Sequence, residues 1–246
     1  MSADSFVQVQ REHHERADAD HFRWQTQSPW FAATEAALVD GVHAGPGERL
    51  LEIGCGEGGN LHHLRERCAN ATVFGVDFSA ARAAFARSAT GAITATADAG
   101  RLPFASASFD AVLIRDLLHH LPDRRRALTE AHRVLTARGR LTLVEPNRRA
   151  PLVLLQATLV KAERGLFASS AEQLRTELLA TGFRIEREEP LQPFPVARVV
   201  LNPKLGGERL GNLSPVQRAL DVFDELARHM VPRRAWLYLR FEAVKA

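Results

Sequence analysis

The sequence predicts one α/β domain built on a mostly parallel sheet of seven strands, with helices on both faces and an antiparallel last strand. Short apolar runs alternate with amphipathic stretches from residue 49 onward, which is the rhythm of βαβ units. A glycine-rich turn directly follows the first apolar run. At 246 residues, the chain is long enough for one large core and too short for two catalytic domains.

Seven segments have the length and apolar pattern of strands. The first five follow one another with helical segments between them, and right-handed crossovers would bring their carboxyl ends to one edge of the sheet. The predicted strands cover residues 49–54, 71–77, 92–98, 109–116, 139–146, 183–189 and 236–244.

Helical segments complete a single domain over residues 1–246. Residues 1–45 are expected to form an N-terminal helical cap, with one helix starting at Ser28-Pro29. Residues 46–148 would form the central core, in which a helix over residues 123–136 ends with Gly139 as its C-cap. An insertion at 190–234, rich in Pro and Gly before a helix that starts at Ser214, would form a lid.

Composition argues against several classes of protein. The net charge is +3 and basic residues are scattered among acidic ones, so we expect no nucleic-acid partner. Two cysteines without a CxxC pair, and no His/Cys cluster with zinc spacing, predict neither a disulfide framework nor a metal site. The polar N-terminus and the lack of an apolar run of roughly 20 residues indicate a cytoplasmic protein without a membrane span. Either a monomer or a homodimer is compatible with the sequence.

The segment LLEIGCGEGGNL carries the strongest functional signal. Gly54, Gly56 and Gly58 can adopt positive φ and leave the backbone open to a closely bound ligand. Spacing alone would also fit a dinucleotide site. Glu52, however, places a carboxylate where a pyrophosphate would be repelled and an ammonium group would be held. Asp77 follows the second strand, where a carboxylate can accept two ribose hydroxyls.

Four motifs in order resemble those of class I S-adenosylmethionine (SAM)-dependent methyltransferases, close to the methyltransferase type 11 and ubiquinone/menaquinone methyltransferase-like group. They are EIGCGEG, VDFS, ADAGRLPF and FDAVLIRDLLHHLPD, within residues 49–145. The resemblance implies a Rossmann-like fold and SAM as the cofactor. It also implies that residues 52–58, including Glu52, Gly54, Cys55, Gly56 and Gly58, face the methionine part.

The resemblance assigns further residues to the cofactor. Asp77 would bind the ribose and Phe78 would lie beside the adenine. Asp98 and Ala99 would contact the adenine edge, and Arg115 would lie beneath the cofactor at the end of the fourth strand.

Candidates for catalysis follow the fourth and fifth strands. His119 and His120 are candidate general bases, with hydrogen bonding to the loop backbone as the alternative, and Glu145 is a second candidate for contact with the methyl acceptor. A small-molecule acceptor is expected, with oxygen favoured over nitrogen or carbon. The acceptor cavity would be shaped by the 190–234 insertion and by aromatic residues of the N-terminal cap, which could instead simply dock a helix: Phe22, Trp24, Trp30 and Phe31.

Other functions stay open from the sequence alone. An N- or C-methyltransferase for a lipid or quinone-like acceptor would carry the same cofactor motifs. The glycine spacing permits an NAD(P)-dependent oxidoreductase, although the single tyrosine, Tyr238, lies near the C-terminus. A protein that binds SAM without turnover is the third possibility.

Overall fold

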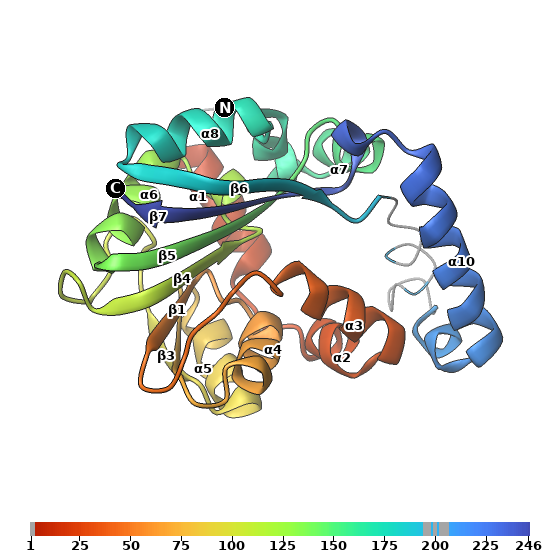
Figure 1. Cartoon of the computed structure of the whole chain (residues 1–246), viewed down its shortest axis with the longest axis horizontal. Helices are drawn as coiled ribbons and strands as arrows, with labels where there is room; N and C mark the ends of the chain where they lie inside the picture. Colours follow the sequence, from red (N-terminus) through yellow and green to blue (C-terminus); the bar gives the residue numbers. More distant parts are fainter. Residues whose placement is uncertain (1–2, 194–197, 199–200, 202–206) are drawn as a thin grey trace.

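The computed structural model describes residues 3–193, 198, 201 and 207–246. Its centre is a seven-stranded sheet in the order β3-β2-β1-β4-β5-β7-β6 (Figure 1). β7 pairs antiparallel with both β5 and β6, and the other pairings are parallel, which confirms the predicted fold class. The strands are β1 (Arg49–Ile53), β2 (Thr72–Asp77), β3 (Ile93–Thr96), β4 (Phe109–Arg115), β5 (Leu135–Pro146), β6 (Phe183–Leu191) and β7 (Tyr238–Lys245).

Alternating side chains of the central strands divide the core into two layers. Leu51 and Ile53 of β1 pack against α6 (Arg124–Val134) and α8 (Ala171–Ala180). Leu50 packs on the other face against α4 (Gly59–Arg67) and α5 (Ala80–Thr90). Figure 1 shows these two helix pairs on opposite sides of the sheet. Because side chains alternate along a strand, Glu52 projects to the same face as Leu50, toward α4.

The N-terminal cap consists of α1 (Ala3–His14), α2 (Ala19–Gln27) and α3 (Pro29–Leu38). α3 begins at Ser28-Pro29 as predicted, although the Ser28 hydroxyl makes no capping hydrogen bond. Trp24 and Phe31 are buried and their rings stack 3.8 Å apart, in a cluster with Leu201 and Leu220. Trp24 and Phe31 therefore pack the helices of the cap together, and a role of the aromatic residues in shaping the acceptor cavity stays a prediction.

One predicted boundary is wrong. α6 ends at Val134 and β5 starts at Leu135, so Gly139 lies inside a strand and caps no helix. Leu135 already pairs with Phe109 of β4. Pairing with the neighbouring strand therefore decides where this helix ends, and the local glycine signal does not.

The segment between β6 and β7 is described in part. Residues 194–197, 199–200 and 202–206 of the predicted 190–234 insertion lie outside the described residues. The rest includes η4 (Glu208–Asn212), α10 (Ser214–Met230) and η5 (Arg233–Ala235). Between β5 and α8 the chain forms α7 (Pro151–Leu159) and η2 (Lys161–Ala168). No described helix combines the length and apolar character that crossing a bilayer requires.

Candidate active site

The glycine loop after β1 adopts the left-handed backbone conformation that its glycines predict. Gly54, Gly56 and Gly58 have φ values of +82°, +51° and +89°. A Cβ on Gly54 would lie 2.9 Å from a methyl carbon of Leu117, so this position is crowded as well. At Gly56 the nearest atom to such a Cβ is a guanidinium nitrogen of Arg82 at 3.8 Å. Gly56 therefore keeps the space above the loop clear, as a closely bound ligand would need.

Glu52 is a fully buried carboxylate with one oxygen unsatisfied. Its Oε1 accepts a hydrogen bond of 2.6 Å from Asn60 Nδ2, whereas Oε2 has no partner. Burial raises the pKa of Glu52 to about 8. An unpaired buried carboxylate oxygen is costly unless a ligand supplies a donor. The site thus fits the ammonium of a methionine moiety, the group that sequence analysis places here.

Two further predicted residues, Cys55 and Asp77, lie at the glycine loop. The Cys55 thiol is buried, and burial raises its pKa well above the ordinary range, so it stays protonated. Asp77 Oδ2 accepts from Gly56 N and its Oδ1 accepts from Ser79 N, both at 2.9 Å. Each of these oxygens has a second lone pair. Asp77 can therefore fix two loops and still accept ribose hydroxyls.

The adenine-side residues lie at the carboxyl ends of β2 and β3. Phe78 follows Asp77 and remains 42% exposed, free for a planar ligand. Asp98 is exposed, and its Oδ1 accepts from Gly100 N at 2.8 Å. Ala99 is buried in the core beneath it. The structure thus brings Asp77 and Asp98 to one edge of the sheet, while their contacts with a cofactor stay predictions.

Arg115 lies in a buried network that sequence reasoning missed. Its guanidinium donates to Glu35 Oε2 of α3 and to Asn60 Oδ1 of α4, both at 2.5 Å. Asn60 thereby links Arg115 to Glu52, and Arg198 also donates to Glu35. A lone acid inside the apolar helix WFAATEAAL was the available signal for Glu35. Asn60 follows the glycine motif directly, but many helices begin with an Asn.

Glu145 is the centre of a second buried network, at the end of β5. Its Oε1 accepts from the backbone N–H groups of Leu117 and Leu118, both at 2.8 Å. Its Oε2 lies 2.7 Å from His119 Nδ1. The positive charge of His119 is the main influence that, against burial, lowers the pKa of Glu145. Glu145 is 0% exposed, so the structure places it as a support for the loop after β4.

The two histidines of η1 (Leu118–His120) differ in charge. His119 lies between Glu145 and Glu163, whose negative charges outweigh burial and raise its pKa to about 10. The pKa of His120 is lowered well below its usual range by burial and then by the charge of His119. In this arrangement His119 is protonated and His120 neutral near pH 7. Their roles as general bases stay predictions.

Asp116, which sequence analysis did not select, lies directly after β4, at the carboxyl end of the central strands. It has a φ of +50°, a left-handed conformation that non-glycine residues seldom adopt. Its Oδ2 accepts from the Tyr238 hydroxyl at 3.1 Å and lies 3.2 Å from Arg115 Nε. The side chain is only partly buried, with 36% exposed, and desolvation of the buried part raises its pKa. The signal was an Asp directly after a strand at the carboxyl edge.

Residues 15–18, between α1 and α2, form a short segment that we call the strap. It lies over the rim of the glycine loop. Ser79 Oγ donates to Glu15 O at 2.6 Å, and Arg82 Nε donates to Arg16 O at 3.2 Å. Asp18 N donates to Glu57 Oε1 at 3.1 Å. The N-terminal cap therefore contacts the loops after both β1 and β2. A ligand held by these loops would be shielded from water by the strap.

Comparison with known proteins places this geometry in a family. Residues 51–143 match the model of a methyltransferase domain. The 27-O-demethylrifamycin SV methyltransferase of Amycolatopsis mediterranei is 36% identical over 136 residues, which cover 50% of this chain and 49% of that protein. The demethylmenaquinone methyltransferase of Thermus thermophilus is 37% identical over 103 residues, which cover 40% of this chain and 47% of that protein. The chain thus spans about half the length of these relatives.

A solved structure shows the same fold over the whole chain. Geranyl diphosphate C-methyltransferase from Streptomyces coelicolor, in complex with Mg²⁺, geranyl diphosphate and S-adenosyl-L-homocysteine, superimposes with a TM-score of 0.66 at 17% identity, over 99% of this chain and 98% of that one. The fold and the glycine loop define a class I methyltransferase architecture. Residues 51–143 therefore correspond to a methyltransferase domain, and the fold is the one found in SAM-dependent methyltransferases, which indicates SAM as the cofactor.

Proposed function

We propose that this protein transfers the methyl group of SAM to a small-molecule acceptor, with a hydroxyl oxygen as the favoured methylated atom. The observation that carries the proposal is the open glycine loop beside Glu52, a buried carboxylate whose Oε2 has no partner. An NAD(P)-dependent oxidoreductase receives no support, because residues 51–143 match a methyltransferase domain, and Glu52 once ionised would repel a pyrophosphate.

Residues of this chain can bind both ends of the cofactor. SAM supplies an electrophilic methyl group on a sulfonium. Glu52 would pair with the ammonium, and Asp77 would accept from the ribose. Phe78 would lie along the adenine. The strap over Ser79 and Arg82 would exclude water, which favours alignment of an acceptor with the methyl carbon.

Asp116 is the residue best placed to receive the acceptor proton. In the proposed step, the acceptor oxygen forms a bond to the methyl carbon while the carbon–sulfur bond breaks. The hydroxyl proton passes to the Asp116 carboxylate. The raised pKa of Asp116 brings it closer to working pH, where a general base is more effective. Tyr238 holds the carboxylate through its hydrogen bond.

A hydroxyl acceptor is supported by the relative that methylates 27-O-demethylrifamycin SV, as its name states. The demethylmenaquinone methyltransferase relative supports a quinone-like acceptor as the second candidate. Asp116 favours the first candidate, because removing a hydroxyl proton needs a nearby base.

The test combines binding and turnover. Calorimetry against SAM and NADH should show binding of SAM alone. Methyl transfer from labelled SAM to a panel of hydroxyl, amine and quinol acceptors should give products with a hydroxyl acceptor. Asp116→Asn should lower turnover about 10²- to 10⁴-fold with an unchanged SAM dissociation constant. Asn tolerates left-handed φ, so the backbone is preserved. Tight SAM binding without turnover on any acceptor would instead indicate a non-catalytic SAM-binding protein.

A further inference from the structure

A group of histidine and carboxylate side chains beside the glycine loop has no role in the proposed methyl transfer. His119 and His120 belong to η1, and Glu163 belongs to η2. Metal-ligating atoms of these three residues all lie within 4.8 Å of one another. We propose that His119, His120 and Glu163 bind a divalent transition metal ion such as Zn²⁺. This inference goes beyond the proposed function and does not depend on it.

The spacing of two of these groups fits a shared ion. His119 Nε2 and Glu163 Oε2 form a long ion pair, with 3.4 Å between the two atoms. Tetrahedral zinc with bonds of about 2.0–2.2 Å holds its ligand atoms about 3.3–3.5 Å apart. The gap between the imidazole and the carboxylate is therefore the size that a bridging ion requires.

His119 is already oriented as a ligand. Its Nδ1 lies 2.7 Å from Glu145 Oε2, and Glu145 is fixed in turn by the backbone N–H groups of Leu117 and Leu118. Metal-bound histidines commonly use their second nitrogen in this way, donating it to a carboxylate that sets the ring orientation. The carboxylate of Glu145 thus directs Nε2 of His119 toward Glu163. A metal ion bound there would take the place of the proton that Nε2 carries near pH 7.

His120 contributes a nitrogen with no partner. Its Nδ1 is buried and makes no hydrogen bond, while the ring bonds the backbone of Ala162. The other nitrogen, Nε2, must make that bond, so Nδ1 carries a lone pair. Nearby, His14 of α1 adds a second buried nitrogen without a partner, its Nε2, with the two rings 4.6 Å apart. An unpaired buried nitrogen is costly, and a metal ion would satisfy Nδ1 of His120.

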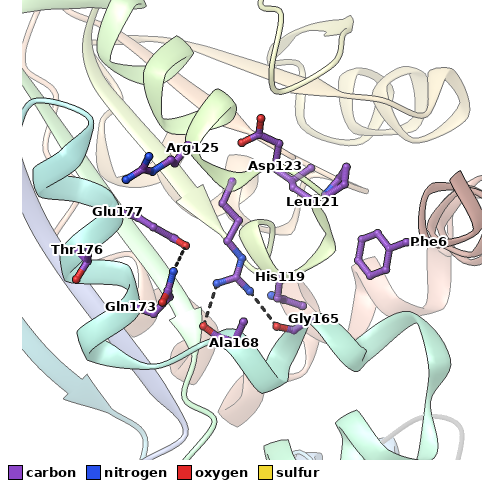
Figure 2. A pocket seen from close by; sticks show the side chains of 12 residues that line it. Phe6, His119, Leu121, Asp123, Arg125, Gly165, Ala168, Gln173, Thr176 and Glu177 are labelled. Atoms are coloured by element: carbon purple, nitrogen blue, oxygen red, sulfur yellow. Dashed lines mark hydrogen bonds between the residues drawn. The ribbon is translucent and has the colours of Figure 1, made fainter. Parts of the chain in front are cut away.

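The fold brings η2 unusually close to η1. A Cβ on Gly165 would lie 1.7 Å from His119 O, so only glycine permits this approach, which places Glu163 against the histidines. His119 also lines an open pocket of about 680 Å³, together with Phe6, Asp123 and Glu177 (Figure 2). Figure 2 shows His119 at the pocket wall beside Gly165.

The donor set selects the class of metal. Two imidazoles and one carboxylate suit Zn²⁺, Co²⁺, Ni²⁺ or Fe²⁺ better than Mg²⁺ or Ca²⁺, which prefer oxygen ligands. Sequence spacing predicted no metal site because Glu163 comes from a later segment that only the fold brings alongside His119.

The test titrates metal-free protein with Co²⁺, followed by visible absorption, and with Zn²⁺, followed by calorimetry. We expect one ion per chain and a tetrahedral Co²⁺ spectrum. His120→Asn and Glu163→Gln should each weaken binding at least about tenfold, in line with the loss of a direct ligand. The matched control is His62→Asn, because His62, His63 and Glu66 form the other group with metal-ligand spacing among the described residues. It should bind as the wild type does.

Two results would overturn the proposal: no stoichiometric binding of either ion, or binding that His62→Asn abolishes while His120→Asn and Glu163→Gln retain it. Circular dichroism checks that each variant folds; if Glu163→Gln does not, His120→Asn decides the question. SAM titration of the same samples separates this inference from the proposed function, because metal binding is expected whether or not SAM binds.

Discussion

Two buried glutamates on either side of β4 show how differently one fold can use the same side chain. Glu52 in β1 has one hydrogen-bond donor, an oxygen without a partner and a pKa raised to about 8. Glu145 in β5 accepts from three backbone N–H groups, those of Leu117, Leu118 and His119, and pairs with the His119 ring, and its pKa is lowered. Both are 0% exposed.

The difference separates a ligand site from a structural support. A carboxylate that the protein satisfies by itself stabilises the loop that it binds. A carboxylate that the protein leaves incomplete lowers stability until a ligand supplies the missing donor. On this basis Glu145 is a structural support at the carboxyl ends of β4 and β5, which we call the acceptor edge because the acceptor is expected there. Glu52 belongs to the proposed cofactor site.

The largest effect is expected from Glu145→Gln. A glutamine amide cannot accept at both positions, so a backbone N–H or His119 is left without its partner. Breaking a buried charged pair costs about 3–5 kcal/mol of unfolding free energy. Chemical denaturation measures it. Glu52→Gln is the matched control and should lose no stability at pH 7. Equal losses in both variants would remove the distinction between the two glutamates.

Glu52→Gln should instead weaken SAM binding. The neutral amide cannot pair with the cofactor ammonium, and a hydrogen bond to a charged group contributes about 1.5–3 kcal/mol, or about 10- to 150-fold in affinity. Calorimetry with SAM measures the loss. A variant that binds SAM as tightly as the wild type would show that the unpaired oxygen has another purpose.

The pH dependence of SAM binding sharpens the same point. Because the pKa of Glu52 is about 8 without ligand, the carboxyl is protonated at pH 7 and must ionise to hold the ammonium. SAM affinity should therefore rise with pH up to about 8, by at most about tenfold per unit. Calorimetry in buffers of different ionisation enthalpy should show proton release on binding. A flat profile, or the same slope in Glu52→Gln, would contradict this assignment.

Folding stability should show the opposite trend. The folded-state pKa of Glu52 is raised above its usual value. The contribution of Glu52 to the free energy of unfolding is therefore fully present below about pH 4.5. It is lost as pH rises through about 8, because the unfolded chain releases the proton more readily. Denaturation of the wild type and of Glu52→Gln at several pH values isolates this contribution.

The comparison also explains what the sequence could predict. The fold class and the glycine loop follow from local signals: apolar runs of strand length, and glycines directly after the first run. Glu52 lies next to those glycines in the sequence, so its place in the site could be predicted. The boundary at Leu135 was not, because pairing with Phe109 overrides the helical pattern.

The acceptor edge depends on contacts between distant segments, which a single sequence does not reveal. Glu35 meets Arg115 only after α3 packs against the sheet, and Glu163 meets His119 only because Gly165 lets η2 approach. Glu145 was selected for acceptor contact from its place at a strand end. The sequence did not reveal that two backbone N–H groups of the neighbouring loop occupy one of its oxygens.

Asp77 accepts from backbone N–H groups as Glu145 does, yet it can still accept from a ligand, as proposed for Glu52. Its substitution should have the smallest effect on SAM affinity. Both oxygens accept a backbone N–H, from Gly56 and Ser79, yet each retains a lone pair for a ribose hydroxyl. Asp77→Asn replaces one acceptor by a donor, which should lower SAM affinity about 2- to 10-fold, the value of one hydrogen bond. An analogue without the ribose 2′-hydroxyl should bind the wild type and Asp77→Asn more equally. If the variant weakens both ligands to the same extent, Asp77 acts only by fixing the glycine loop, and its carboxylate is a support of the kind that Glu145 provides.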